Sequence, residues 1–139
     1  MRFDPSLLIA LVALEISFVF GANADTVYRY NISVVVRDLT TSRRIPNVPV
    51  TLFRLRDTDD WIVVSRGKTI ATGGLNFSSR KYEYTTGTYK LRYDFRNHYN
   101  VTFYPIIDIT FDVSSVLENY PFPVLLSEYG YSTYKGVSN

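Results

Sequence analysis

Few residues in this chain are suited to proton transfer near neutral pH. The 139 residues include one histidine, His98, and no cysteine. Histidine has the ordinary pKa closest to neutrality, so it is the natural candidate for a general base. Its local sequence, Arg96–Asn100, is polar and loop-like, which favours an exposed loop histidine over a catalytic base. The absence of cysteine excludes a thiol nucleophile, a disulfide and a thiolate metal site.

No cofactor or metal site is expected. The sequence has no Ser/His/Asp arrangement, no metal-ligand spacing and no glycine-rich phosphate loop. The net charge of +2 is too small to indicate nucleic-acid binding. A composition of 46% hydrophobic and 20% charged residues is typical of a globular domain. We therefore expect no metal, no cofactor and no nucleic-acid partner.

The first 24 residues have the pattern of a secretory signal peptide. An apolar run over Leu7–Phe20 is followed by Ala22-Asn23-Ala24, which offers small residues at the two positions that a signal peptidase reads. A membrane-spanning helix needs roughly 20 apolar residues, and this run is shorter and contains a glutamate. The sequence predicts a signal peptide over 1–24 and a secreted, extracellular domain over 25–139, with no membrane attachment after cleavage.

Three asparagines begin glycosylation triplets of the form Asn-x-Ser/Thr, namely Asn31, Asn76 and Asn100. Such triplets are glycan acceptors when they lie on the surface of an exported protein. Each is therefore a candidate glycosylation site, and the chain is expected to be a glycoprotein.

Alternation of apolar and polar residues is the main structural signal in the rest of the chain. In Tyr89–Phe95, every second residue is apolar, which is the period of a half-buried strand. Similar patterns predict strands over 31–38, 48–55, 61–65, 75–77, 89–95, 106–113, 124–127 and 128–134. Tyr120–Pro123 is expected to be a rigid connection, and no segment predicts an amphipathic helix. The fold class is therefore all-β: one domain, a two-sheet antiparallel sandwich of seven to eight strands.

Two sequence blocks carry a family resemblance. Tyr131–Gly136 reads Tyr-Ser-Thr-Tyr-Lys-Gly, close to a Tyr-Ser-Thr-Tyr-Arg-Gly-Ser ending, and Asn47–Leu55 is followed shortly by Trp61. Over residues 30–137 the chain resembles the transthyretin and 5-hydroxyisourate hydrolase family. The resemblance implies an eight-stranded, transthyretin-like sandwich and a homotetramer, a dimer of dimers with a channel between the dimers. In transthyretin that channel carries thyroid hormone, and in the hydrolases it holds the active sites for a product of urate oxidation in purine metabolism.

The resemblance also implies where the catalytic groups of a hydrolase would stand. Two histidines, an arginine and a serine of the family fall on Val35, Pro121, Gly74 and Val137, respectively. None of these side chains transfers a proton or binds an anion. The resemblance therefore implies a catalytically degenerate member with no intact catalytic residue.

Tyr134 and Lys135 stand where the family has Tyr-Arg. The lysine carries its charge on a compact ammonium group, whereas arginine would present a planar guanidinium. Together with Val35 and Val137 they would form a ligand site with apolar walls, a phenol and a cation, which suits a small hydrophobic anion. The alternative is that Lys135 is a solvated charge near the C-terminus and takes no part in ligand binding.

Two other functions stay open. One is an active 5-hydroxyisourate hydrolase, a cyclic amide hydrolase with its site rearranged around His98. The other is an extracellular scaffold that binds protein or glycan through tyrosine-rich surfaces, since aromatic residues are enriched in interfaces. The residues favour a protein that is not an enzyme.

Overall fold

The computed structural model describes residues 30–78, 83–98 and 100–137. The expected signal peptide, residues 1–24, lies outside this part of the chain. The described residues form eight strands and no helix, so none of them makes a helix able to cross a membrane. The strands are β1 (Tyr30–Asp38), β2 (Pro49–Leu55), β3 (Trp61–Lys68), β4 (Gly74–Ser78), β5 (Gly87–Asp94), β6 (Ile106–Val113), β7 (Tyr120–Leu126) and β8 (Tyr131–Thr133).

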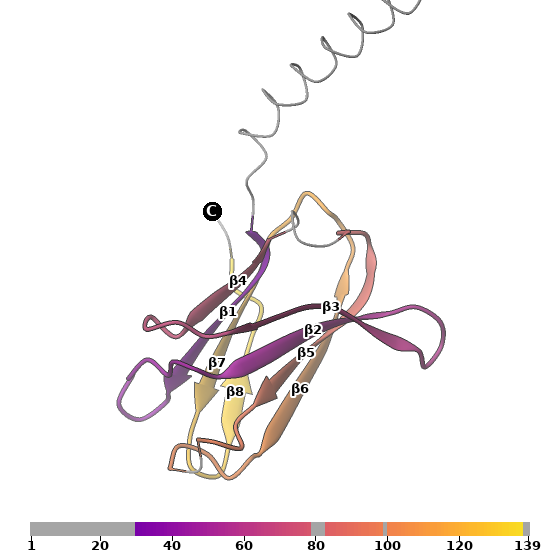
Figure 1. The fold of residues 1–139 in the computed structure, drawn as a ribbon. Coiled ribbons are helices and arrows are strands. Elements are labelled where there is room, and N and C mark those ends of the chain that lie inside the picture. Colours follow the sequence, from indigo (N-terminus) through magenta and orange to yellow (C-terminus); the bar gives the residue numbers. More distant parts are fainter. Residues whose placement is uncertain (1–29, 79–82, 99, 138–139) are drawn as a thin grey trace, which may run out of the picture.

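The strands form two four-stranded sheets that pack face to face (Figure 1). One sheet has the order β4-β1-β7-β8 and the other has the order β3-β2-β5-β6. The predicted two-sheet sandwich is confirmed. The pairing is antiparallel except between β1 and β7, which run parallel. Alternation within a strand carries no information on the direction of its neighbour, so the sequence pattern could not predict this pair.

The core is made by the inward side chains of both sheets. Alternate residues of β1, β5 and β7 are buried, while the residues between them are half-buried. This is the pattern expected of strands that have one face on a core. The buried apolar residues include Ile32, Val34, Val36, Val50, Leu52, Tyr89, Leu91, Tyr93, Phe122, Val124 and Leu126.

The expectation of a rigid connection over Tyr120–Pro123 is wrong, because these residues are the first half of β7. The carbonyl of Pro121 accepts a hydrogen bond from the Gly136 amide, and that of Pro123 accepts one from the Thr133 hydroxyl. Both prolines therefore turn their backbone polar atoms toward β8, which pairs with β7 only from Val124 onward. At these positions β7 behaves as an edge strand, where a missing N–H is tolerated.

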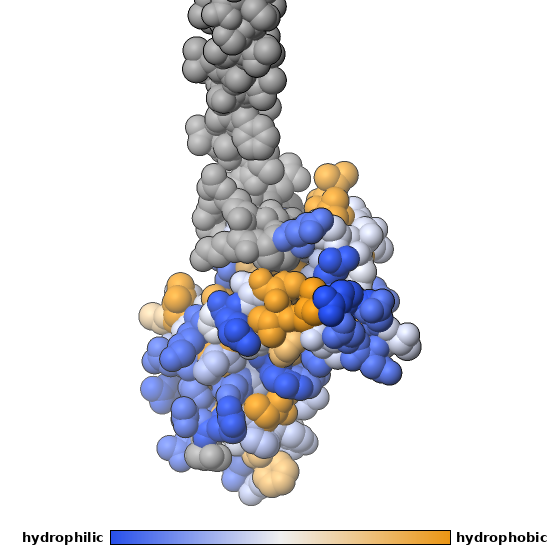
Figure 2. Space-filling model, turned by 45° about the vertical axis from the view of Figure 1, so that its right-hand side comes forward, coloured by the Kyte–Doolittle hydropathy of each residue, from blue (hydrophilic) through white to orange (hydrophobic). Residues whose placement is uncertain are grey.

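Apolar side chains also reach the surface. Figure 2 shows one face of the molecule, where hydrophobic residues gather in a central patch bordered by hydrophilic ones. At the end of the sandwich, four aromatic side chains join the β5–β6 loop to the β7–β8 segment. Phe103 contacts Tyr104 and Tyr129, and the rings of Tyr104 and Tyr131 meet edge to face at 5.3 Å between centroids.

Candidate functional site

The solvent side of the β4-β1-β7-β8 sheet brings together residues from three strands. Because Ile32, Val34 and Val36 point into the core, Ser33, Val35 and Arg37 point the other way. The same alternation turns Pro121, Pro123 and Leu125 of β7 to this side, and register adds Gly74 and Asn76 of β4. We call this set the outward face. It consists of Ser33, Val35, Arg37, Gly74, Asn76, Pro121, Pro123 and Leu125.

The positions that the family resemblance singled out meet on the outward face. Val35 is the direct partner of Gly74 in β4, and on its other side it pairs with Pro123. Pro121 lies one outward position further along β7, opposite Ser33. The Gly136 amide donates to the Pro121 carbonyl over 2.8 Å, which brings the C-terminal segment to the same place. Val137, the next residue, is 89% exposed.

The side chains at this meeting point supply no proton-transfer group. Val35, Pro121 and Pro123 are apolar, and Gly74 has no side chain. The outward face, as defined above, contains neither a histidine nor a carboxylate. Hydrolysis of a cyclic amide needs a base to activate water, and this face does not offer one.

Two arginines border the apolar part of the outward face. Arg37 follows Val35 on the same side of β1, and it forms an isolated antiparallel bridge with Arg44. The Arg44 guanidinium donates to the Thr72 carbonyl over 3.0 Å, close in sequence to Gly74. Sequence reasoning missed both arginines, although the spacing of two between positions 35 and 37 in a strand was a sufficient signal for Arg37.

Lys135 lies elsewhere. It forms an ion pair with Glu118, and its Nζ lies 4.8 Å from the centre of the Tyr120 ring. Tyr120 is buried on the core side of β7, opposite to the outward face. The lysine also holds the pKa of Glu118 below its ordinary value. These contacts hold Lys135 away from Val35. Among the described residues, Tyr134 forms no ion pair or ring contact of this kind, and its side chain is 56% exposed.

His98 lies against the loop between β1 and β2. Its Nε2 is 3.2 Å from the Pro46 carbonyl, which only accepts, so Nε2 carries the hydrogen. Its ring packs edge to face on Phe95, and Nδ1 is buried without a partner among the described residues. His98 lines a cavity of about 500 Å³ between the β1–β2 and β5–β6 loops. It is not among the residues that pair with Val35.

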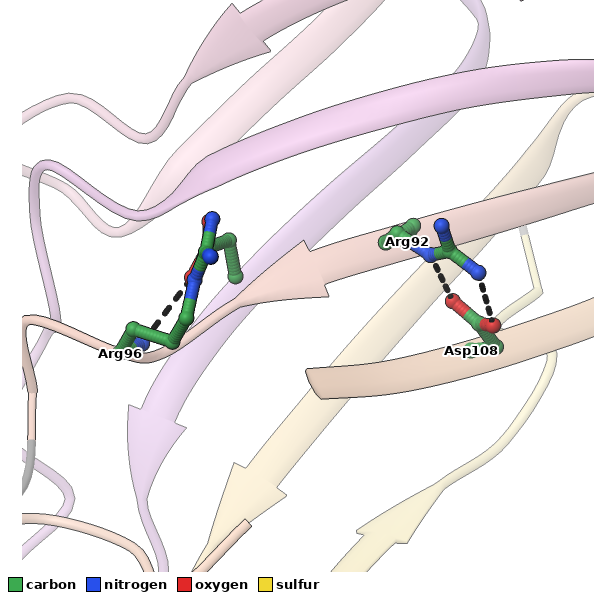
Figure 3. Close-up of polar contacts among 4 residues, drawn as sticks. Arg92, Arg96 and Asp108 are labelled. Carbon is green, nitrogen blue, oxygen red and sulfur yellow. Dashed lines mark hydrogen bonds and ion pairs between the residues drawn. The ribbon is translucent and has the colours of Figure 1, made fainter. Parts of the chain in front are cut away.

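The solvent side of the other sheet carries its own polar residues. Arg92 and Asp108 face each other across β5 and β6 in a two-point contact, with both N–O distances at 2.8 Å (Figure 3). Lys90 lies over the rings of Phe53 and Trp61 at 4.9 and 4.3 Å. These cations are already matched to a carboxylate or to aromatic rings, so this surface has the character of a stabilised sheet face.

The candidate glycosylation sites differ in their surroundings. Asn76 is exposed in β4 and lies opposite Ser33 on the outward face. Asn100 is exposed in the β5–β6 loop. Asn31 belongs to β1, and its side chain lies outside the described part of the structure. A glycan on Asn76 would stand over the same face as Val35.

The tyrosines serve two purposes. Tyr89, Tyr93 and Tyr120 are buried in the core, in agreement with a packing role. Tyr129 and Tyr131 are 72% and 43% exposed at the end of the sandwich. The tyrosine content therefore reflects both the core and one surface cluster.

Comparison with known proteins places this geometry in a family. The model of the HIUase/transthyretin family, where HIUase is 5-hydroxyisourate hydrolase, matches residues 32–136. A 5-hydroxyisourate hydrolase of Salmonella dublin is 31% identical over 109 residues, which cover 76% of this chain and 79% of the relative. A probable 5-hydroxyisourate hydrolase of Caenorhabditis elegans is 28% identical over 110 residues, 76% of this chain and 81% of the relative.

A solved structure supports the same fold. Sea bream transthyretin in complex with thyroxine superposes with a TM-score of 0.69 at 20% identity, covering 78% of this chain and 96% of that one. The sandwich, the order of its strands and the extent of the family match agree with one another. The chain belongs to the HIUase/transthyretin family.

Proposed function

We propose that this protein is a secreted, catalytically degenerate member of its family that binds a small hydrophobic anion on the outward face. One observation carries the proposal: Val35, Gly74 and Pro121, on which the family resemblance places catalytic groups, meet on this face, with Val137 following Gly136. A shallow apolar surface without a base is suited to binding rather than to hydrolysis.

A second copy of the chain would complete the site. The residues around Val35 are half-buried in a single chain, so a second copy could cover them further. The family resemblance implies a homotetramer with a channel between dimers, and a channel would enclose the ligand against two such faces. Sedimentation equilibrium of the purified protein should then give the mass of a tetramer, and a stable monomer would contradict this part of the proposal.

The proposed site combines strand residues of the outward face with the C-terminal segment. Val35, Pro123 and Leu125 supply apolar walls, and Tyr134 and Val137 belong to the C-terminal segment beside them. Lys135 is engaged by Glu118 and the Tyr120 ring, so the proposed site does not use it.

Calorimetry with naphthalene-2-carboxylate tests the binding. Saturable binding to the purified protein is expected, and Val35→Glu should abolish it because a carboxylate would then stand on the apolar face. Val63→Glu is the matched control, since Val63 is 41% exposed on β3 of the other sheet. Equal loss of binding in both variants, or no binding to the parent protein, would contradict the proposal.

Hydrolase activity is tested separately. In a coupled assay in which urate oxidase generates 5-hydroxyisourate, the intermediate should disappear at its spontaneous rate. The loss of a general base alone lowers a rate by about 10²–10⁴-fold. Enzyme-dependent decay that is abolished by His98→Ala would instead establish a relocated active site in the cavity beside Pro46.

Secretion and glycosylation are proposed from the sequence pattern of residues 1–24 and the three triplets. N-terminal sequencing of the secreted product should begin at Asp25. A glycan on Asn76 would cover the outward face, so molecules that carry one at this position should not bind the ligand. Treatment with peptide-N-glycosidase, followed by mass spectrometry of each asparagine, measures which sites carry a glycan.

A further inference from the structure

The isolated backbone bridge between Arg37 and Arg44 sets two arginines directly opposite each other. In an antiparallel bridge the two partner side chains lie on the same side of the sheet. Like charges on residues directly opposite each other are destabilising. An anion between the two would turn this repulsion into two attractive contacts.

The surrounding residues do not neutralise the two arginines. Among the described residues, no carboxylate forms an ion pair with Arg37 or Arg44. The nearest acid along the chain, Asp38, points to the other side of β1, and its Oδ1 accepts hydrogen bonds from the Thr40 and Thr41 amides at 2.9 Å. Arg44 spends one N–H on the Thr72 carbonyl. Most of the ten guanidinium N–H donors of the pair therefore remain available.

The apolar part of the outward face begins directly beside this pair. Arg37 pairs with Leu125 of β7, and Val35, one outward position along β1, pairs with Pro123. A ligand with an anionic end at the arginines would extend its body over Leu125, Val35 and Pro123. The spacing of two residues along a strand, roughly 7 Å, matches the length of a small fused-ring body.

From this juxtaposition we infer that Arg37 and Arg44 form the anion-binding end of the ligand site, and that the ligand is a carboxylate or sulfonate with a flat apolar body. The inference rests on the proposed ligand-binding function, and it assigns the cation to these arginines in place of Lys135. Guanidinium groups suit such an anion because their planar forks match the two oxygens of a carboxylate.

A matched pair of probes separates the anion site from the apolar face. Naphthalene-2-carboxylate and naphthalene-2-carboxamide have the same body, but only the first carries a charge at neutral pH. In calorimetric titration of the purified protein, the carboxylate should bind about tenfold or more tightly than the carboxamide, as charge-assisted hydrogen bonds predict. This ratio should shrink as NaCl is raised, because exposed charges are screened.

Arg37→Gln/Arg44→Gln should reduce the ratio to about one, because the carboxylate then loses the charged donors that favour it over the carboxamide. The single variants show whether each arginine contributes. Arg66→Gln, at an exposed position of β3 on the other sheet, is the control for the loss of positive charge and should keep the ratio. A thermal melt of each variant without ligand verifies that it is folded.

The outcomes distinguish the two claims. Equal affinity for both probes in the parent protein, or a ratio that survives in the double variant, would overturn the anion site and leave an apolar binding face. If neither probe binds, the proposed function and this inference both fail. If Arg66→Gln lowers the ratio of carboxylate to carboxamide affinity as much as the double variant does, the preference reflects the net charge of the protein. That result would also overturn the assignment to Arg37 and Arg44.

Discussion

Arg92 and Asp108 form a two-point ion pair that fastens β5 to β6 on the solvent side of the sandwich. The guanidinium lowers the pKa of Asp108 below its ordinary value of 3.8. The folded state therefore holds the ionised carboxylate more favourably than the unfolded chain does. Such a contribution is present above the unfolded pKa and is lost as the pH falls through the folded one.

We predict that Asp108→Asn lowers the free energy of unfolding by about 0.5 kcal/mol near pH 7, since both side chains are partly exposed and solvent weakens the pair. The difference from the parent protein should be constant above about pH 5 and vanish toward pH 2. Urea unfolding at a series of pH values measures it. A difference that grows on acidification would contradict this account.

Tyr93 and Tyr89 make a second prediction, because both are fully buried but only one has its hydroxyl paired. The Tyr89 hydroxyl donates to the Thr85 carbonyl over 2.8 Å, whereas the Tyr93 hydroxyl has no partner among the described residues. Burial raises the pKa of Tyr93, so its hydroxyl stays neutral. Tyr89→Phe should cost about 1 kcal/mol, while Tyr93→Phe should be neutral or stabilising.

Chemical denaturation of the two phenylalanine variants decides between these effects. The Tyr93 ring stacks on Phe95 with 6.1 Å between centroids, and that contact is kept in the variant. An equal loss of stability in both variants would mean that the Tyr93 hydroxyl has a partner after all.

Thr69, which follows β3, forms hydrogen bonds to the segment that precedes β2. Its hydroxyl donates to the Ile45 carbonyl over 2.8 Å and accepts from the Val48 amide over 2.9 Å, and the residue is only 2% exposed. Thr69→Val keeps the shape but leaves a buried N–H and a buried carbonyl without this partner. We expect a loss of about 2 kcal/mol. Thr58→Val, at an exposed position in the β2–β3 hairpin, should change the free energy of unfolding by less than about 0.5 kcal/mol.

Two adjacent glycines at the start of β4, Gly73 and Gly74, should differ in how much a methyl group destabilises the protein. At Gly73, with φ of +74°, a Cβ would lie 2.5 Å from the Val36 carbonyl oxygen. At Gly74 it would meet the Thr72 hydroxyl at 3.2 Å and the Val34 carbonyl oxygen at an ordinary contact distance of 3.7 Å. Gly73→Ala should therefore destabilise the protein by about 2 kcal/mol or more, and Gly74→Ala should cost much less. Thermal unfolding of both variants measures the contrast, and similar midpoints would refute it.

The alternation of residue types was enough to predict most of the sandwich. Ile107–Val113 alternates without interruption, and the predicted strand over Ile106–Val113 forms β6 over the same residues. Tyr120–Pro123 could not be recognised as strand, because the tolerance of two prolines depends on β8 being too short to reach them. The parallel direction of β7 beside β1 likewise depends on the path of the whole chain.

The candidate site was predictable only in part. The family resemblance identified Val35, Gly74 and Pro121, and the register brings these residues together. It gave no guidance on Arg37, which follows from strand alternation alone. Lys135 drew attention as a charge near the end of the chain, but its partner Glu118 lies far from it in sequence, and only the folded structure brings the two together.

The parallel contact between β1 and β7 has a consequence for how the protein is made. The sheet that carries Val35 joins the first and seventh strands, so a nascent chain emerging from the ribosome cannot close it until nearly all of the domain has been synthesised. Domains dominated by such distant pairings fold over milliseconds to seconds. During that interval β1, rich in valine, would be an exposed segment prone to aggregation until β7 is available to pair with it.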